Sequence, residues 1–366
     1  MREEIRQKIW IVTFFLLICG VHLFWLAVRN RIDLENYENR ASVERPVFSF
    51  DKIEEFPAEY EAYYNDHLPF RNGLIRLNSE IEYYIFQNSS NPNVIKGKDG
   101  WLFYNSSVDD NPMETYKGLN LFTEEELVKI KDNLLHSKSV LEGKGIEFVL
   151  FIAPNKERIY MEKMPDYYGP PAECYRTKQL IAYLEENTDI RIVYPYEDLW
   201  KAKENREELL YYRLDTHWNY MGGYIGSYAL AEELGISMVP LEELTVTETE
   251  PTICDLADML NMRKKLNTDR DFVLSGYDRY HVTTEKHDLI GEYIYHCQGA
   301  DPRKLFMLRD SFADAMDDFI AAQFDESYMV HYKSFSQELI DEQQPDIFVY
   351  ETVERRIGEL LKFRIE

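Results

Sequence analysis

Short apolar segments that alternate with helix-like segments restrict the fold of this chain more than any other feature. Five such segments are "IEFVLFIAP" (146–154), "IRIVYP" (190–195), "KLFML" (304–308), "SYMVHY" (327–332) and "DIFVYE" (346–351). Short segments that are apolar on both faces are typical of parallel strands, which are covered by helices on each side of the sheet. The sequence therefore predicts an α/β fold with a parallel sheet flanked by helices.

The segments between these strands carry helix signals. Residues 123–145 begin with Thr123 and Glu126 at capping-box spacing and end on two glycines, with apolar residues at helical intervals between them. Further helices are predicted at about 175–186, 223–234 and 313–323. A turn and strand in "VIKGKDGWLFY" (94–104) resemble a hairpin. The region of about 245–299 shows no clear period and is predicted to be an irregular insertion.

The first part of the chain predicts a membrane anchor. Residues 9–28 contain no formal charge and would form a helix of about 30 Å, enough to cross a bilayer core. A cleavable signal peptide and a lipid attached at Cys19 are alternatives that the flanking residues do not favour. Residues 1–8 would then be a cytoplasmic amino terminus and residues 29–93 an extracytoplasmic stalk with one or two covering helices. The lysines and arginines on the two sides are nearly balanced and leave the orientation open.

Charge and residue types exclude several kinds of partner. The formal net charge is −25, with 41 Lys and Arg against 66 Asp and Glu, which argues against binding to nucleic acid. Four cysteines allow few disulfides and do not identify a compartment. His281, His287, His296 and Cys297 fit no ordinary zinc spacing. We therefore expect no metal and no cofactor.

Two segments carry residues suited to nucleophilic catalysis. In "YYRLDTHWNYMGGY" (211–224), Asp215 is placed to orient the imidazole of His217, although this stretch is also suited to cap the helix that follows. In "KLFMLRDSFADAM" (304–316), Ser311 follows a predicted strand and begins a helix, which is the position of a nucleophile. Either Ser311 or Asp310 could instead serve only as a helix cap.

Taken together, the two segments supply an orienting carboxylate, a base and a nucleophile. Asp215, His217 and Ser311 all lie in loops beside predicted parallel strands, where they can converge. Asp66 and His67 form a competing acid and imidazole pair. If the segment is extended, however, adjacent side chains point in opposite directions. The sequence therefore favours the first set.

The order of several motifs resembles a known family. "VIKGKDGWLFY", "IAPNKERIY", "LDTHWNYMGGY", "DLADML", "LRDSFADAM" and "DIFVYETVER" are similar to motifs of the SGNH-hydrolase-like alginate O-acetylation proteins and the related DHHW proteins, over about residues 39–356. The resemblance implies an SGNH-like domain at 94–366 that acetylates an exported or cell-envelope polysaccharide outside the membrane. It also implies a partner, a multi-spanning membrane O-acyltransferase that supplies the acetyl group, and an amino terminus inside the cell.

The resemblance also assigns roles to residues. Asp215 would orient His217, which would take the proton of Ser311 as the serine becomes an acetyl ester. Besides the Ser311 amide, candidate oxyanion or substrate residues are Asn155, Lys156, Arg309 and Asp310. Glu351, Arg355 and Trp101 are expected to brace the site or the fold.

Two positions depart from the family pattern. Arg309 stands where the family usually has glycine, so its side chain could close the oxyanion pocket or add a cation beside an anionic polymer. Thr216 stands where DHHW proteins have histidine. Two other functions therefore stay open: an esterase with the same triad, and a non-catalytic polysaccharide-binding member of a biosynthesis complex.

Overall fold

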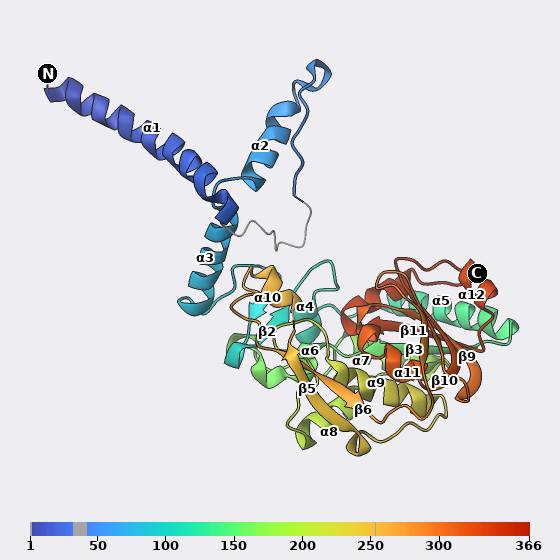
Figure 1. The fold of residues 1–366 in the computed structure, drawn as a ribbon. Helices are drawn as coiled ribbons and strands as arrows, with labels where there is room; N and C mark the ends of the chain where they lie inside the picture. The colour runs from blue at the N-terminus through green and yellow to red at the C-terminus, as the bar shows by residue number, and fades with distance from the viewer. Residues whose placement is uncertain (1, 32–41, 253) are drawn as a thin grey trace. The chain divides into compact units, whose positions relative to one another are not determined.

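The computed structural model describes residues 2–31, 42–252 and 254–366, which form two compact units (Figure 1). One unit comprises Met1–Asn91 and Ala257–Leu266, and the other comprises Pro92–Leu256 and Asn267–Glu366. Residues 32–41 of the predicted stalk, including the start of the family resemblance, and residue 253 of the predicted insertion lie outside the described residues.

The first unit is helical. It contains α1 (Arg2–Val28), α2 (Phe56–Asp66) and α3 (Arg71–Tyr84), with short 3-10 helices η1 (Arg29–Arg31) and η2 (Phe50–Lys52). Within the described residues, one helix is long and apolar enough to cross a membrane by length and composition, and its side chains are exposed. The segment 257–266 joins this unit, where Asn91 donates to the Met259 carbonyl at 3.0 Å.

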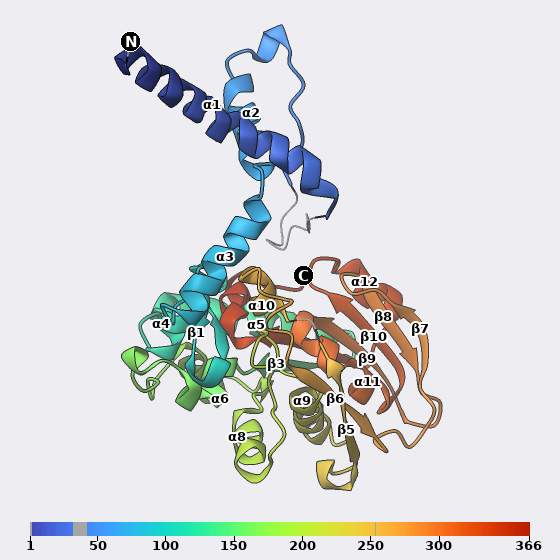
Figure 2. The same ribbon diagram turned by 60° about the vertical axis from the view of Figure 1, so that its left-hand side comes forward.

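The second unit is built on a seven-stranded sheet with the order β4-β3-β11-β9-β10-β8-β7 (Figure 2). Its parallel strands are β4 (Arg191–Val193), β3 (Glu147–Ala153), β11 (Ile347–Val353), β9 (Asp301–Arg309) and β10 (Phe324–His331). These are the five strands that the apolar segments predict. They form because their side chains are buried on both faces, as in β11, where every residue is buried.

The sheet is mixed because the predicted insertion adds strands to it. β8 (Glu292–His296) pairs with β10 in antiparallel orientation, and β7 (Thr283–His287) pairs with β8. A separate antiparallel pair, β5 (Thr245–Pro251) and β6 (Arg270–Ser275), lies in the same region. The insertion is therefore not irregular. Among its strands, β7 lacks a sequence signal because it lies at the edge of the sheet and exposes all five of its side chains.

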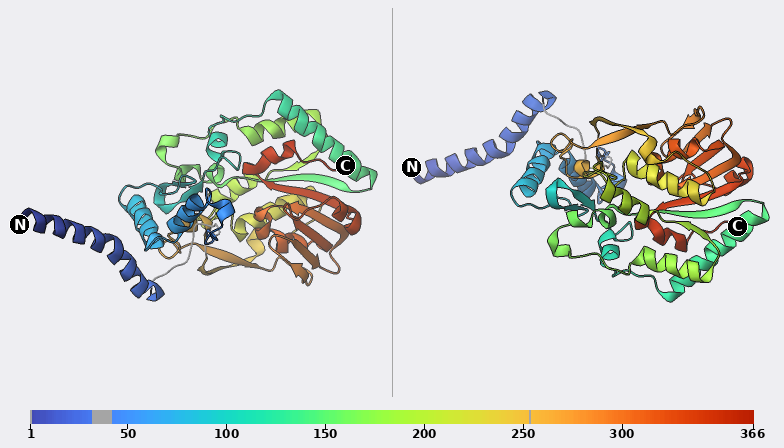
Figure 3. Two further views of the ribbon diagram at one scale, coloured as in Figure 1. Left: turned by 90° about the horizontal axis from the view of Figure 1, so that it is seen from above. Right: turned by 90° about the horizontal axis from the view of Figure 1, so that it is seen from below.

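Helices cover both faces of the sheet (Figure 3). Phe148 and Leu150 of β3 pack with the helices α5 (Glu124–Gly143), α7 (Arg176–Asn187), α12 (Glu338–Gln343) and η8 (Glu354–Leu361). Val149 and Phe151 pack on the other face with α8 (Tyr196–Asn205), α9 (Tyr220–Glu233) and α11 (Asp317–Ala321). Alternate residues of one strand thus serve two separate cores.

The remaining elements are short. They are β1 (Val94–Lys96) and β2 (Leu102–Tyr104), which pair as the predicted hairpin, α4 (Pro112–Tyr116), α6 (Lys156–Ile159), α10 (Asp255–Met259), η3 (Lys98–Gly100), η4 (Met161–Lys163), η5 (Asp166–Tyr168), η6 (Leu241–Glu243) and η7 (Ser311–Ala315). The helix predicted at 313–323 is divided into η7 and α11. Strands β3, β9 and β11 end at the same edge of the sheet, and their loops build the site described next.

Candidate active site

Asp215, His217 and Ser311 form one hydrogen-bonded series. The Nδ1 of His217 donates to Asp215 Oδ1 at 2.6 Å, and Ser311 Oγ donates to His217 Nε2 at 2.8 Å. The direction follows from the carboxylate, which accepts and cannot donate when it is ionised. Asp215 also accepts the His217 backbone N–H at 3.0 Å. Two segments separated by more than ninety residues are therefore joined with the polarity that nucleophile activation requires.

The charges of this pair reinforce each other. Burial opposes ionisation of Asp215, but the hydrogen bond and the charge of His217 outweigh it and lower the pKa of the carboxyl. Burial likewise opposes protonation of His217, but Asp215, and then the charge of Asp255, raise the pKa of the imidazole. The site thus stabilises the imidazolium that forms when the histidine removes a proton.

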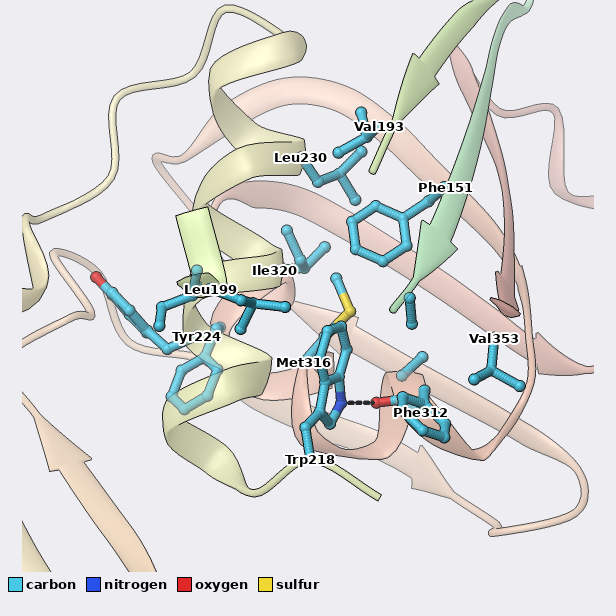
Figure 4. Packing of buried hydrophobic residues seen from close by; sticks show 14 of the residues in the cluster. Phe151, Val193, Leu199, Trp218, Tyr224, Leu230, Phe312, Met316, Ile320 and Val353 are labelled. Carbon is cyan, nitrogen blue, oxygen red and sulfur yellow. Dashed lines mark hydrogen bonds between the residues drawn. The ribbon is translucent and has the colours of Figure 1, made fainter. Parts of the chain in front are cut away.

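The two residues after His217 connect its loop to the turn that carries Ser311 and to helix α9. Trp218 is fully buried, and its Nε1 donates to the Phe312 carbonyl at 2.7 Å (Figure 4). Asn219 caps α9 by accepting from the N–H groups of Met221 and Gly222. The helix cap considered for this stretch is therefore Asn219, which leaves Asp215 free to orient the imidazole. The helix consequently begins at Tyr220 and continues through the glycines.

Glycines of α9 let this helix approach the serine turn closely. A Cβ placed on Gly223 would lie 2.0 Å from the Ala315 carbonyl oxygen, and one on Gly226 would lie 2.8 Å from the Trp218 ring. Real side chains do not tolerate such separations, so a larger residue would push α9 away from η7. This contact fixes the distance between Ser311 and the loop that carries His217 (residues 211–219, the histidine loop).

Asp310 holds the turn that presents Ser311. Its Oδ1 accepts from the Phe312 N–H and its Oδ2 accepts from the Val353 N–H, both at 2.8 Å. Its own N–H donates to Glu351 Oε2 at 2.8 Å, and burial raises the pKa of the Glu351 carboxyl well above its usual range. Both carboxylate oxygens of Asp310 are thus occupied by backbone N–H groups, so the side chain acts as a cap and strand clamp rather than as a substrate contact.

Lys156 and Asn155 lie at the end of β3 with different surroundings. The Nζ of Lys156 donates to three carbonyls of the histidine loop, those of Tyr212, Arg213 and Asp215. An ammonium has three donors, so Lys156 supports this loop and has none left for an oxyanion. Asn155 is buried, and its side-chain amide has no hydrogen-bond partner within the described residues.

Arg309 is bound by partners outside the triad. Its guanidinium is fully buried, pairs with Asp314 at 2.6 Å, donates to the Leu289 carbonyl and lies over the Tyr293 ring. These internal contacts supply no support for the two effects expected of an arginine at this position, closing the oxyanion pocket and contacting a polymer. Tyr293 and Leu289 belong to the insertion, which covers the side chain.

Two further groups lie beside the triad: Asp255, to which the sequence analysis assigned no role, and Arg355, which was expected to brace the site or the fold. Asp255, in the "DLADML" motif, accepts from both the N–H and the hydroxyl of Thr216. The guanidinium of Arg355 lies over the rings of Tyr104 and Phe312, within 3.5 Å of Thr216 oxygens. The only sequence signal for Asp255 was its motif, because it lies in the region that appeared irregular.

Three side chains at this site have metal-ligating atoms within 4.8 Å of one another, those of Asp215, His217 and Asp255. The 2.6 Å separation of His217 Nδ1 and Asp215 Oδ1 fits a shared proton. Two ligands of one tetrahedral zinc ion lie about 3.3 Å apart, so the pair as it stands does not fit an ion.

Two of the other histidines considered from the sequence, His287 and His296, have separate partners. His287 donates to Asp317 and His296 to Glu285, while buried Cys297 lies near the Ala322 carbonyl. Asp66 and His67 end helix α2 rather than lying in an extended segment, and they do not pair with each other. Asp66 accepts from the Val43 N–H, and His67 Nδ1 donates to the Tyr63 carbonyl.

Comparison with known sequences identifies the central part of the chain. Residues 94–292 match the model of the SGNH hydrolase-like domain of the acetyltransferase AlgX. Proteins named probable alginate O-acetylase AlgJ are 28% identical over 209 residues in Pseudomonas syringae pv. tomato and 26% identical over 174 residues in Pseudomonas putida. These matches cover 55% and 47% of this chain and 49% and 41% of the relatives, so the chain spans less than half the length of either.

Solved structures share the fold. A DHHW family protein from Eubacterium siraeum superposes with a TM-score of 0.54 at 15% identity, covering 75% of this chain and 99% of the other. PatB1 from Bacillus cereus superposes with a TM-score of 0.54 at 14% identity, covering 74% and 99%. At such identities the likeness shows the architecture alone.

Proposed function

The chain belongs to the family of SGNH hydrolase-like AlgX acetyltransferase domains, and on that premise we propose that it is a polysaccharide O-acetyltransferase that works through a serine ester. The observation that carries the proposal is the series Asp215, His217 and Ser311, with separations of 2.6 and 2.8 Å. This series supplies an oriented base to a hydroxyl at the carboxyl edge of a parallel sheet.

The first half of the reaction acetylates the enzyme. Ser311 Oγ attacks the acetyl carbonyl of the donor while His217 Nε2 takes the serine proton. The bond between the acetyl carbon and the leaving group then breaks, and His217 returns the proton to that group. Asp215 keeps the imidazole in the required tautomer and stabilises its positive charge.

The second half transfers the acetyl group to the acceptor. A sugar hydroxyl gives its proton to His217 and attacks the ester, and the bond to Ser311 Oγ breaks as the serine regains a proton. The Ser311 N–H is one donor for the oxyanion of both half-reactions. The buried, unpartnered amide of Asn155 supports it as a second donor.

We place the reaction outside the membrane. In this proposal residues 9–28 anchor the chain, residues 29–93 form the stalk and residues 94–366 form the catalytic domain. The exposed, apolar α1 supports the anchor. A multi-spanning membrane O-acyltransferase would supply the acetyl group, and an exported or cell-envelope polysaccharide would accept it.

Intact mass spectrometry tests the covalent step. The full chain in detergent is incubated briefly with an activated acetyl ester, alongside the variants Ser311→Ala and His217→Ala. We expect one adduct of about 42 Da in the wild type, none in Ser311→Ala, and a much slower rise in His217→Ala. Circular dichroism confirms that each variant is folded.

Addition of polysaccharides separates the alternatives. Acetyl groups that appear on a glycan identify a transferase, whereas loss of the adduct to water alone, with any glycan, identifies an esterase. A folded wild type that neither forms the adduct nor turns over the ester contradicts catalysis. It would leave a polysaccharide-binding role.

A further inference from the structure

Three hydrogen bonds connect Asp255 to Asp215 and to Thr216, the residue between Asp215 and His217. Its carboxylate accepts from the Thr216 N–H at 2.8 Å and from the Thr216 hydroxyl at 2.6 Å. Its own backbone N–H donates to Asp215 Oδ2 at 2.7 Å. These contacts hold Thr216, the residue between the acid and the base, and also occupy the Asp215 oxygen that faces away from the imidazole.

The position of Thr216 makes these contacts relevant to catalysis. A residue between two members of a triad transmits any rotation of its backbone to both of them. Asp255 fixes its N–H, and the Thr216 hydroxyl lies 3.2 Å from His217 Nδ1. We propose that Asp255, supplied by the inserted segment, is a positioning residue that keeps Asp215 and His217 in line with Ser311.

The charge of Asp255 adds a second effect. Its Oδ2 lies 3.9 Å from His217 Nδ1, close enough to favour the imidazolium. Burial, and then the nearby Asp215, raise the pKa of the Asp255 carboxyl to about 6. Asp255 is therefore charged above pH 6 and loses its charge as the pH falls below that value.

Other charged or titratable groups lie near the same atoms. Those that influence Asp215, His217, Asp255 or their neighbours come from α6, the insertion, η7 and η8, namely Lys156, Cys254, Asp269, Asp314 and Arg355. Arg355 and Lys156 oppose the effect of Asp255 on the imidazole, since both are cations. They are unchanged in the variants below, so a difference between variants reports Asp255.

The proposal rests on the proposed function, but its test does not require acetyl transfer. The full chain in detergent is treated with phenylmethylsulfonyl fluoride at a series of pH values, and the sulfonyl adduct on Ser311 is followed by intact mass. The rate reports how much of His217 is available as a base. Acetyl transfer is measured separately, so a protein that is sulfonylated but does not transfer acetyl contradicts only the proposed function.

Asp255→Asn keeps the shape and the backbone N–H but removes the charge. We expect the plateau rate to fall about five- to tenfold, the effect of weakening one or two hydrogen bonds. In the plot of sulfonylation rate against pH, the rate falls at low pH as His217 becomes protonated, and this part of the curve is the acidic limb. The limb should move to lower pH by about 0.7 unit, which is the effect of a charge about 4 Å away with the screening of bulk water. The direction follows because loss of a negative neighbour lowers the pKa of His217.

Two further variants separate positioning from folding. Thr216→Val keeps the Asp255 charge and should lower the plateau without moving the limb to lower pH. Asp258→Asn changes a carboxylate of the same short helix that pairs with Arg263, and should change neither quantity. An Asp255→Asn variant with the wild-type rate and limb, or with a lower rate but an unmoved limb, overturns the proposal. So does a wild type whose Ser311 is never sulfonylated.

Discussion

Two imidazole–carboxylate pairs of the second unit have a buried carboxylate, and only one of these two leads to a nucleophile. His217 binds Asp215 through Nδ1 and faces Ser311 with Nε2. His287 binds Asp317 through Nε2 at 3.0 Å, and its ring lies flat on Tyr293 at 3.9 Å between ring centroids. Both carboxylates are buried. The acid–imidazole pair alone therefore does not define a catalytic site.

The difference lies in what surrounds each carboxylate. Asp215 accepts from His217 and from two backbone N–H groups, and its pKa is lowered. Asp317 also accepts from His287, Tyr295 and a backbone N–H, but burial and the adjacent Asp318 raise its pKa to about 6. The first pair is prepared to stabilise an imidazolium, whereas the second connects the edge strand β7 to α11.

Removal of each imidazole gives the largest expected contrast. His217→Ala should lower the rate of Ser311 acetylation about a thousandfold or more, because the serine loses its base. His287→Ala should leave that rate within about twofold. The measurement is the initial rate of adduct formation by mass spectrometry. Similar losses in the two variants would contradict the distinction between the pairs.

Amide substitution of the carboxylates tests the same contrast at the acids. Asp215→Asn should slow acetylation by about 100-fold to 10,000-fold, since an amide can hold the wrong tautomer of His217. Asp317→Asn retains an acceptor for Tyr295 and should have little effect on the rate. Stopped-flow hydrolysis of an activated ester measures both. A slow Asp317→Asn with unchanged stability would assign it a role in catalysis.

The close approach of α9 to η7 supports only the first pair. Gly223→Ala should reduce the free energy of unfolding by about 3 kcal/mol, because the added Cβ meets the Ala315 carbonyl. Gly143→Ala is the matched control, since nothing lies within 4 Å of its Cβ and alanine favours the helix. Thermal unfolding of both variants gives the comparison, and equal stabilities would contradict it.

The indole of Trp218 links the two loops of the first pair. Trp218→Phe removes the donor to the Phe312 carbonyl and should cost about 1 to 2 kcal/mol of stability, with slower acetylation. Trp200→Phe, on the partly exposed surface of α8, is the control. If Trp218→Phe matches this control in both stability and rate, the link contributes nothing.

The second pair should appear in the dependence of stability on pH. The folded pKa of Asp317 is about 6, above its usual 3.8, so the folded state holds this proton more tightly. Its contribution to stability is present below about pH 4 and is lost as the pH rises through 6. Asp317→Asn should remove this slope, about 2 kcal/mol, in denaturant unfolding at pH 4 to 7. An unchanged slope would contradict the assignment.

Much of the fold was predictable where burial leaves a sequence pattern. Strands β3, β9 and β11 are apolar on both faces, and this pattern located them and the loops at their ends. The edge strand β7 was not predicted, because a strand with every side chain exposed has no apolar period. Its place in the sheet depends on pairing with β8, which no local pattern records.

The residues of the site were predictable from their types and positions, whereas the orientations of some of their side chains were not. Asp215, His217 and Ser311 were selected because their chemistry suits their positions after strands, and the structure brings them together. The directions of Lys156 and Arg309 were not predictable, since each depends on a distant segment. Lys156 donates hydrogen bonds to carbonyls of the histidine loop, and the guanidinium of Arg309 lies over the ring of Tyr293.

The segment 257–266 has a practical consequence for cleavage of the chain. The polypeptide passes between the two compact units at three points, after Asn91, Leu256 and Leu266. A single proteolytic cut after Asn91 would therefore not separate the two compact units from each other. The fragment that carries Ser311 would still contain residues 257–266, which would then lack the helices of the first unit. Cuts after Leu256 and Leu266 would instead release residues 257–266, and the first of these cuts would lie directly after the residue that follows Asp255.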